Sequence, residues 1–285
     1  MLRIGFIGAG KVATTLAIGL SNKGYPVIAI SSRSRESAKN LANRISGCLA
    51  YDNNQEVANN AELIFITTPD DVIASVAAEV KWHPEQSVIH CSGAYSTDIL
   101  EPARKAGALV GAFHPLQTFA SSKQENISGI TFAIEAEEPL LAKLKDMATA
   151  LDGYRVEIGA GDRVIYHAAA VFACNYLVTL VKIATDLWQT FSVPPDQATR
   201  ALLPLIRGTL HNIDTIGIPQ CLTGPIARGD TGTIRKHLNA LKEKAPALLS
   251  PYKELGLQTI PVALAKGRIN EQQASELETI LKQAD

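Results

Sequence analysis

The sequence predicts an α/β domain built on a mostly parallel sheet, followed by an all-helical domain. Short apolar runs alternate with amphipathic segments through residues 1–160, which is typical of βαβ units. From residue 162 onward no run is typical of a strand, and helical periodicity continues to the C-terminus. A glycine-rich turn directly follows the first apolar run, as expected where a strand enters the first helix of such a sheet.

The apolar runs of the first domain predict its strands in order. They are expected at residues 2–7, 26–31, 63–67, 87–91, 109–113, 130–134 and 155–158, with a weaker strand at 48–51. Helices are expected between them at residues 11–22, 36–44, 71–79 and 139–151. The pattern changes at Gly159–Gly161, so we expect an α/β domain over residues 1–160 and an all-α domain over 161–285.

The most apolar part of the second domain is residues 164–188. Polar residues interrupt it at His167, Asn175, Lys182 and Asp186. We therefore expect a buried helix here rather than a membrane span. Proline and glycine break the later helical pattern near 194–195, 217–219, 224–225 and 251.

Composition excludes several classes of protein. The chain has 285 residues, enough for two domains, and its net charge of −1 gives no basic field for nucleic acid. The four cysteines are far apart and form no C-x-x-C pair, so we expect neither a disulfide framework nor a metal site. The first residues lack the charged flank and long apolar core of a signal peptide. These features favour a cytoplasmic protein in a reducing compartment.

The glycine turn predicts a dinucleotide site. Gly8, Ala9, Gly10, Lys11 and Val12 join the first strand to the first helix in a G-x-G-x-x-A pattern. The glycines permit a tight turn and a close approach of the backbone to a pyrophosphate, which the N–H groups of the helix start face. The alternative is a glycine turn that binds nothing. We predict a Rossmann-type doubly wound sheet that binds a dinucleotide.

The loop after the second strand indicates which dinucleotide. NAD sites usually carry Asp or Glu about 20 residues after the turn, to bind the ribose hydroxyl. Here Ser32, Arg33 and Ser34 follow the strand, with no acid before Glu36. A guanidinium and two hydroxyls suit a phosphate, so the loop favours NADP(H). The alternative is a polar loop in which Ser34 caps the next helix, and both can hold together.

Two further strand ends are expected to border the nicotinamide. Thr68, Pro69 and Asp70 follow one strand, and Ser92 and Gly93 follow the next. Ligands of open α/β sheets lie beyond the carboxyl ends of the strands. The alternatives are helix capping by Asp70 and a simple turn at Gly93.

His167 is the candidate proton donor for reduction of a carbonyl or imine. It lies eight residues before Asn175 in an apolar helical segment, so both are expected on one helix face, about 12 Å apart along the axis. Buried polar groups need partners, which a substrate would provide. The alternative is a core histidine and an asparagine that bridges to a neighbouring helix.

Three other segments contain candidate substrate contacts. His114 follows a predicted strand and could donate a proton, and Gln117 could bind substrate, although a structural His-Pro turn explains His114 as well. In the later segment LTGPIARGD, Thr223 and Arg228 are candidate contacts for a carboxylate. Alternatively Arg228 pairs with Asp230, which is expected near the start of the next helix.

Over nearly its whole length the sequence resembles NADP-dependent oxidoreductases that join a Rossmann-like domain to a helical C-terminal domain. The segments that carry the resemblance are GFIGAGKVA, SSRS, HCSGA, HPLQTF, YHAAAVFACN and LTGPIARGD. Wider relatives are ketopantoate reductase, pyrroline-5-carboxylate reductase and the 3-hydroxyacid dehydrogenases. In ketopantoate reductase a lysine precedes two asparagines at four-residue intervals. His167 stands at that lysine and Asn175 at the second asparagine, with Val171 between.

The resemblance implies a homodimer formed through the helical domain and a small carboxylate substrate. Together with the motifs, it predicts an NADPH-dependent reductase of a small, ketopantoate-like 2-oxo acid, with His167 as general acid and Asn175 orienting the substrate. One alternative is an imine reductase resembling pyrroline-5-carboxylate reductase. Another is a non-catalytic NADPH-binding sensor whose second domain serves a protein partner.

Overall fold

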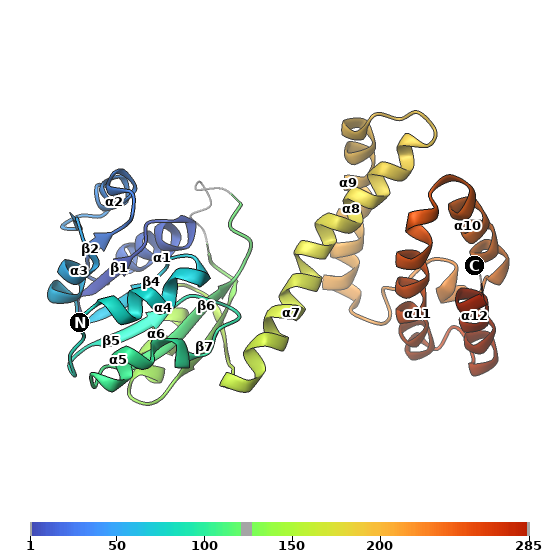
Figure 1. Ribbon diagram of the computed structural model, residues 1–285. Coiled ribbons are helices and arrows are strands. Elements are labelled where there is room, and N and C mark those ends of the chain that lie inside the picture. Colours follow the sequence, from blue (N-terminus) through green and yellow to red (C-terminus); the bar gives the residue numbers. More distant parts are fainter. Residues whose placement is uncertain (1, 121–126, 284–285) are drawn as a thin grey trace. The chain divides into compact units, whose positions relative to one another are not determined.

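The computed structural model describes residues 2–120 and 127–283 and divides the chain into two compact units (Figure 1). Unit 1 comprises Met1–Asn175 and unit 2 comprises Tyr176–Asp285. Each unit has a hydrophobic core of its own, and each is described by itself below.

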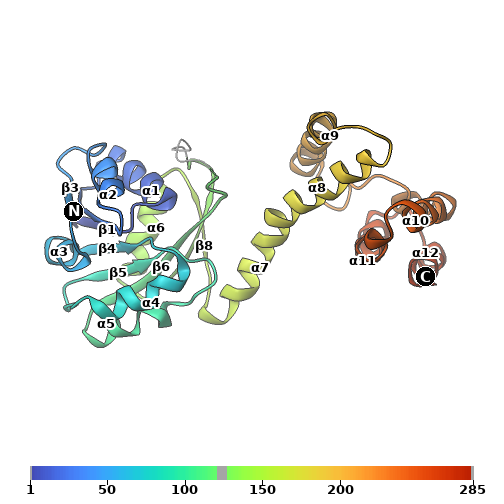
Figure 2. The same cartoon turned by 45° about the horizontal axis from the view of Figure 1, so that its top comes forward.

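Unit 1 is built on one eight-stranded sheet with the strand order β3-β2-β1-β4-β5-β6-β7-β8. The strands are β1 (Ile4–Ile7), β2 (Val27–Ser31), β3 (Leu49–Tyr51), β4 (Leu63–Ile66), β5 (Ser87–His90), β6 (Leu109–Leu116), β7 (Thr131–Ala136) and β8 (Tyr154–Glu157). The first six are parallel, β7 is antiparallel to β6, and β8 pairs parallel with β7 at the edge of the sheet (Figure 2). This order is that of a Rossmann-type doubly wound fold, so the predicted fold class is confirmed.

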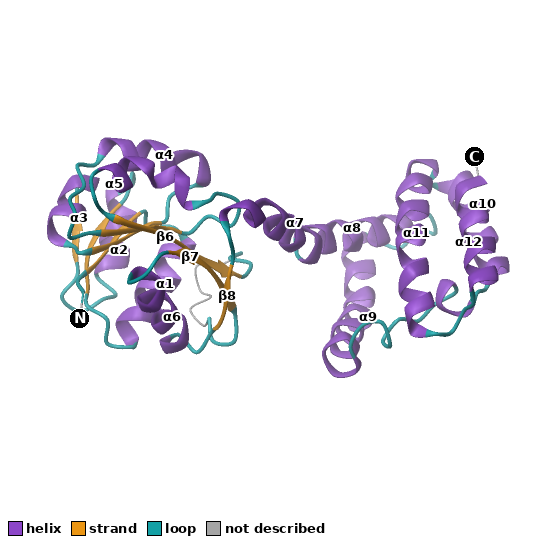
Figure 3. Ribbon diagram, turned by 90° about the horizontal axis from the view of Figure 1, so that it is seen from below, coloured by secondary structure: helices purple, strands orange, loops and turns teal. Residues whose placement is uncertain are grey.

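Helices cover both faces of the sheet (Figure 3). They are α1 (Lys11–Asn22), α2 (Arg35–Ala42), α3 (Asn54–Asn60), α4 (Asp70–Glu79), α5 (Glu101–Lys105) and α6 (Leu140–Ala150). The core on one face contains residues of α1, α2 and α6, and the core on the other contains residues of α3, α4 and α5. Because both faces are covered, β1, β4 and β5 are buried throughout, which explains the uninterrupted apolar sequences of β1 and β4.

Unit 2 is helical in its described part. Its helices are α8 (Asn175–Gln189), α9 (Pro195–Ile216), α10 (Thr231–Lys244), α11 (Leu249–Lys266) and α12 (Glu271–Gln283), with the short 3-10 helix η3 (Ile226–Arg228) before α10. The core of the unit comes from η3, α10, α11 and α12. Asp230 caps α10 by accepting a 3.0 Å hydrogen bond from the backbone N–H of Thr233, as expected near that helix start.

The domain boundary expected from the sequence lies before α7 (Arg163–Ala173), and the division between the two compact units lies after it. The expected domain boundary near residue 160 coincides with the change from strands to helices, since β8 ends at Glu157. The compact units divide 15 residues later, between Asn175 and Tyr176, because α7 contacts the sheet of unit 1 through Arg163 and Tyr166. The assignment of residues 1–160 and 161–285 as domains remains a prediction.

The expectation of a buried helix at residues 164–188 is wrong for the single chain. Val164, Ile165 and Phe172 are each 70% exposed, and Val178 is 69% exposed. Periodicity shows that a helix face is apolar but not which molecule covers it, and that is why the prediction failed. Among the described residues, the segment Ala160–Gln189 is the one helix whose length and composition would also suffice to cross a bilayer, a weak indication that many water-soluble helices share.

The helix expected to carry both His167 and Asn175 is interrupted. α7 ends at Ala173 and α8 begins at Asn175, with Cys174 between them (φ −113°, ψ −66°). The spacing argument treated this stretch as one helix, and the shared face of His167 and Asn175 remains a prediction.

Candidate functional site

A cavity of about 520 Å³ lies in unit 1 beyond the carboxyl ends of β1, β2 and β4. The predicted cofactor residues that line it are Gly8, Ala9, Gly10, Ser32, Arg33, Ser34, Thr68 and Pro69. The sequence argument therefore located the principal wall of this cavity, which we call the nucleotide cleft. Lys11, Val12, Asp70, Ser92 and Gly93, predicted with them, are not among the residues that line it.

The glycine turn has the geometry that a pyrophosphate requires. Gly8 has a φ of +111°, and an added Cβ there would lie 2.8 Å from the carbonyl carbon of Thr67, so no other residue fits. At Gly10 an added Cβ would meet nothing within 4 Å, so the glycine leaves open space above the helix start. No side chain caps α1 at Gly10, which leaves the first N–H groups of the helix available to an anion.

Thr68 adds an unsatisfied group to the same cleft. Its hydroxyl oxygen is buried and has no hydrogen-bond partner among the described residues. A buried hydroxyl without a partner is costly, and a bound ligand would satisfy it. The turn and this hydroxyl both fit a dinucleotide.

The arginines of the next loop have different surroundings. Arg35 forms a 2.7 Å ion pair with Asp52, whereas Arg33 makes no hydrogen bond or ion pair with a described residue and is exposed at the cleft. Ser34 caps α2 by accepting a hydrogen bond from the N–H of Ser37, as the alternative interpretation of this loop predicted. Arg33 is therefore the guanidinium of this loop that is free to bind a phosphate.

Sequence reasoning did not select the other residues that line the nucleotide cleft. They include Ser37, Asp52, Asn53, Asn54, Thr67, Val72, Ser75, Val76 and Glu79. Asn54 links two elements there: its Oδ1 accepts from the hydroxyl of Ser31, and its Nδ2 donates to Glu79 at 2.5 Å. The rule that ligands bind beyond strand ends would have pointed to residues 52–54, since they follow the weak strand β3.

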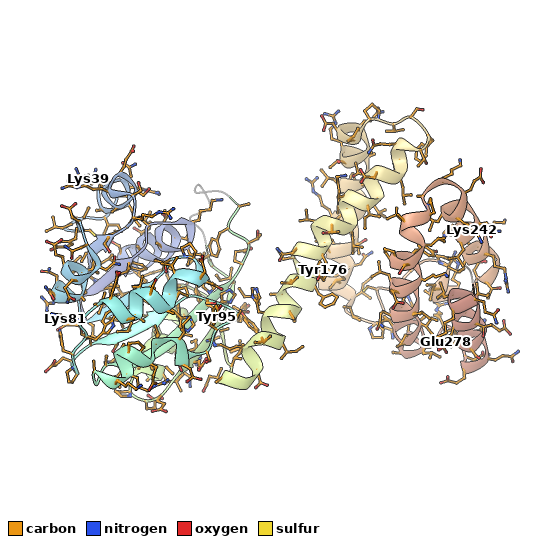
Figure 4. All side chains as sticks on the ribbon, in the orientation of Figure 1. Lys39, Lys81, Tyr95, Tyr176, Lys242 and Glu278 are labelled. Carbon is orange, nitrogen blue, oxygen red and sulfur yellow. The ribbon has the colours of Figure 1, made fainter. Side chains whose placement is uncertain are left out.

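Asp70 and Ser92 join the loops after β4 and β5. The Ser92 hydroxyl donates a 2.7 Å hydrogen bond to the Asp70 carboxylate and accepts from the N–H groups of Ala94 and Tyr95 (Tyr95 is labelled in Figure 4). The predicted capping of α4 by Asp70 is wrong, because Pro69 is the N-cap residue and Asp70 lies in the first turn. Lys11, another predicted cofactor residue, donates a hydrogen bond from its Nζ to the carbonyl of Ala120.

A histidine cluster surrounds Gly93, directly after β5. An added Cβ at Gly93 would lie 2.8 Å from His167 Nδ1 and 2.9 Å from His114 Nε2, so the two imidazoles face the same point above the backbone. Their ring centroids are 6.4 Å apart. His114 lies within β6, one residue beyond the end predicted for that strand, and His167 lies on α7. His167 Nδ1 is buried and has no partner among the described residues.

Tyr166 and Arg163, which sequence reasoning missed, hold this cluster together. The Tyr166 hydroxyl lies 2.8 Å from His114 Nδ1. Arg163 is fully buried; its Nε contacts Glu135 at 2.5 Å and its Nη1 donates to the Ser92 carbonyl at 3.1 Å. The helix carrying His167 is thereby fixed to β7 and to the loop after β5. A buried arginine partner could not be paired from sequence, because Glu135 lies 28 residues away.

Burial and positive charge lower the pKa of two histidines, His114 and His90. Burial, followed by the Arg163 guanidinium and the His167 ring, lowers the pKa of His114 to about 4. The pKa of His90, on β5, is also lowered to about 4, chiefly by burial and then by Arg163. Burial raises the pKa of Tyr166 to about 12. At neutral pH His114 is thus a neutral imidazole beside a protonated phenol.

The remaining predicted contacts lie elsewhere in the fold. Gln117 follows β6, and its side-chain oxygen accepts from the N–H of Thr118, a local contact. Asn175 begins α8. Thr223 and Arg228 line a cavity of about 360 Å³ within unit 2, together with Lys266 and Arg268. Lys266 donates to the carbonyls of Gln220 and Leu222 and so orders this loop.

Two family models match the chain. Residues 1–115 match the Rossmann-like domain, and residues 130–259 match DUF2520, a domain of unknown function. The two matches follow one another along the chain and together cover most of it. The histidine cluster combines them, since Gly93 and His114 belong to the Rossmann-like match and His167 to the DUF2520 match.

Solved and curated proteins are similar to parts or to most of this chain. A candidate NADP oxidoreductase from Bacteroides fragilis has a structure similar to this one, with a TM-score of 0.71 at 28% identity, covering 91% of this chain and 97% of that chain. Pyrroline-5-carboxylate reductase 3 of Rattus norvegicus is 37% identical over 79 residues, which are 27% of this chain and 29% of the enzyme. The 2-(hydroxymethyl)glutarate dehydrogenase of Eubacterium barkeri is 25% identical over 61% of this chain and 60% of the enzyme.

The chain matches only part of each curated relative. This chain matches less than a third of the rat reductase and less than two thirds of the bacterial dehydrogenase. The similarity to the Bacteroides structure, by contrast, extends over 91% of this chain and 97% of that chain.

Proposed function

We propose that this protein is an NADPH-dependent oxidoreductase that reduces a carbonyl or imine group of a small carboxylate substrate. The observation that carries the proposal is that one edge of the sheet presents both halves of such a site. The nucleotide cleft with the free Arg33 lies beyond β1, β2 and β4, and two imidazole nitrogens face Gly93 beyond the neighbouring β5. The similar Bacteroides protein, described as an NADP oxidoreductase, supports this assignment.

The cofactor would be held by groups that the structure leaves available. The helix start at Gly10 suits the pyrophosphate, the Thr68 hydroxyl suits a polar group of the dinucleotide, and Arg33 suits the 2′-phosphate. When bound, the reduced nicotinamide supplies a hydride, and the protein must supply a proton and orient the substrate.

His167 and His114 would share the second task. His167 would give the proton to the substrate oxygen or nitrogen, and His114, which stays neutral, would donate a hydrogen bond to the same atom. Neutral imidazoles can act in this way as electrophiles that polarise a carbonyl. Asn175 and Gln117 remain proposed substrate contacts.

The two substrate classes are separated by their relatives and by a direct assay. Similarity to the rat pyrroline-5-carboxylate reductase supports an imine substrate, and similarity to the bacterial 2-(hydroxymethyl)glutarate dehydrogenase supports a carbonyl substrate. We expect purified protein to oxidise NADPH with a ketopantoate-like 2-oxo acid. A screen of 2-oxo acids and cyclic imines by absorbance at 340 nm tests this; turnover with imines alone would establish the alternative, and turnover with neither would favour a non-catalytic NADPH sensor.

The cavity of unit 2 has the residues of a carboxylate site, and Thr223 and Arg228 remain proposed substrate contacts. Arg228 and Arg268 line it without a hydrogen bond to a described residue, and no acidic residue is among its lining residues. A guanidinium binds a carboxylate through two parallel hydrogen bonds. The double variant Arg228→Ala/Arg268→Ala should therefore raise KM with little change in kcat, whereas Arg235→Ala, on α10 outside this cavity, should change neither.

We also propose that the protein is a cytoplasmic homodimer. The exposed apolar residues of α7, α8 and α9 include Val164, Ile165, Tyr176 (Figure 4), Val178, Leu205, Leu210 and Ile213. A second copy of the same face would cover them, as expected for an isologous interface. The four cysteines, all in the described part of the chain, form no disulfide, which is consistent with a reducing compartment.

A further inference from the structure

Tyr166 and His114 are joined by a hydrogen bond that determines what His114 can do. The Tyr166 hydroxyl lies 2.8 Å from His114 Nδ1, and the two rings meet edge to face at 87° with centroids 5.6 Å apart. The contact links α7 to β6, 52 residues apart in the sequence. It occupies one ring nitrogen of His114, and the other ring nitrogen, Nε2, is the one that faces Gly93.

The protonation states of the two side chains decide the direction of this bond. The charged and titratable groups around His114 are Arg163, Tyr166 and His167 on α7 and His90 on β5. Burial and Arg163 hold the pKa of His114 at about 4, and burial raises that of Tyr166 to about 12. A neutral imidazole has one N–H and one lone pair, and a phenol O–H is a better donor than its oxygen is an acceptor. Tyr166 therefore donates to Nδ1, and the ring proton of His114 resides on Nε2.

We propose that Tyr166 is a positioning residue that holds His114 as the Nε2–H tautomer, so that a neutral imidazole presents an N–H donor above Gly93. The part of this inference that concerns substrate rests on the proposed reductase function. In that function the N–H stabilises the negative charge that grows on the substrate oxygen or nitrogen as hydride arrives, while the proton itself comes from His167. The opposite tautomer would present a lone pair to the same atom and repel it.

Arg163 keeps His114 in the neutral form from which Tyr166 selects one tautomer. Its buried guanidinium disfavours a second positive charge on His114, so the histidine remains a neutral donor over the physiological pH range. Because Arg163 and Tyr166 are neighbours on α7, the same helix turn keeps His114 neutral and selects its tautomer. The neutral form alone would leave two tautomers, and the phenol selects one of them.

The tautomer can be measured without cofactor or substrate. Long-range ¹H–¹⁵N correlation spectra of the full-length protein at pH 7.5 distinguish a protonated from an unprotonated ring nitrogen. We expect His114 in the wild type to be protonated at Nε2 only. In Tyr166→Phe both tautomers should be populated, and with an active substrate kcat should fall about tenfold with KM nearly unchanged, a part of the 10²–10³ loss seen when an oxyanion donor is removed.

A second tyrosine–histidine pair provides the matched control. In unit 2 His237 Nδ1 lies 2.8 Å from the Tyr252 hydroxyl, with the rings at 85° and centroids 5.9 Å apart. Tyr252→Phe should alter the signals of His237 and leave those of His114 and the turnover unchanged. This control separates loss of the specific hydrogen bond from a general effect of removing a phenol.

Two results would overturn the inference: a wild-type His114 protonated at Nδ1, or a Tyr166→Phe variant whose His114 tautomer is unchanged. An unchanged kcat in a variant whose tautomer has shifted would also overturn the positioning role. Failure of the wild type to reduce any substrate would count against the proposed function, and the spectra of the protein alone would then still decide whether Tyr166 sets the tautomer.

Discussion

Arg35 forms a 2.7 Å ion pair with Asp52, and this contact leaves Arg33 as the unpaired arginine at the nucleotide cleft. Arg33 and Arg35 are close in sequence and carry the same charge, yet only Arg33 is free to bind a phosphate.

Arg33→Ala should weaken NADPH binding and leave NADH binding nearly unchanged. A charge-assisted hydrogen bond is worth about 1.5–3 kcal/mol, so the dissociation constant for NADPH should rise about 10- to 100-fold. Fluorescence titration with both nucleotides measures this. Arg35→Ala is the matched control and should have a much smaller effect, since its guanidinium is already paired with Asp52. Equal affinity of the wild type for NADPH and NADH would contradict the assignment.

Gly93→Ala should abolish most of the turnover and spare NADPH binding. The new Cβ would lie 2.8 Å from His167 Nδ1 and 2.9 Å from His114 Nε2, closer than real Cβ atoms approach such groups, so both imidazoles must move. We expect kcat to fall at least about 100-fold, the scale of misplacing the reacting groups. Gly161→Ala is the control, because an added Cβ there meets nothing within 4 Å. A Gly93→Ala enzyme with normal kcat would show that the space above Gly93 is not used.

His167→Gln should lower kcat by about 10²–10⁴, the usual contribution of a general acid, with NADPH affinity nearly unchanged. His114 should add no titration near neutrality, since its pKa is about 4. Steady-state kinetics between pH 5 and 9 test both statements. Near-normal turnover of the variant would instead make His114 the proton donor.

Acid should destabilise the Rossmann-like domain through His90 and His114. Both have a folded pKa of about 4 against an ordinary value of 6.5, so the unfolded chain binds more protons between these values. The free energy of unfolding therefore falls as pH falls from 6.5 towards 4. Each histidine contributes about 2 kcal/mol between pH 7 and pH 5. Urea unfolding at pH 7 and pH 5 measures this loss of unfolding free energy, which should be smaller in His90→Asn than in the wild type. The exposed His83→Asn should match the wild type.

The exposed apolar face of α7 and α8 should make the protein a dimer. Ile165→Glu and Val178→Glu place charges where Ile165 is 70% and Val178 is 69% exposed, and should shift the wild-type dimer to a monomer in sedimentation velocity. Leu49→Glu, at a residue of β3 that is 60% exposed, is the control and should leave the dimer intact. A monomeric wild type, or partition of the wild type onto lipid vesicles, would argue against a homodimer.

The sequence by itself determined the doubly wound sheet, the glycine turn and the phosphate-selecting loop. These features depend on local patterns: strands buried on both faces are apolar throughout, and a turn with a φ of +111° at Gly8 requires glycine whatever surrounds it. Ser34 as a helix cap was equally local.

Tertiary structure alone decided which polar residues meet. The pairing of Tyr166 with His114 and of Arg163 with Glu135 joins residues 52 and 28 positions apart, and nothing in the local sequence of either partner encodes the other. α7 and α8 are also separate helices that meet at Cys174, whereas the spacing argument for His167 and Asn175 treated them as one, and spacing predicts a common face only while a helix is continuous. Local sequence fixes backbone conformation, whereas contacts between distant side chains depend on how the elements pack.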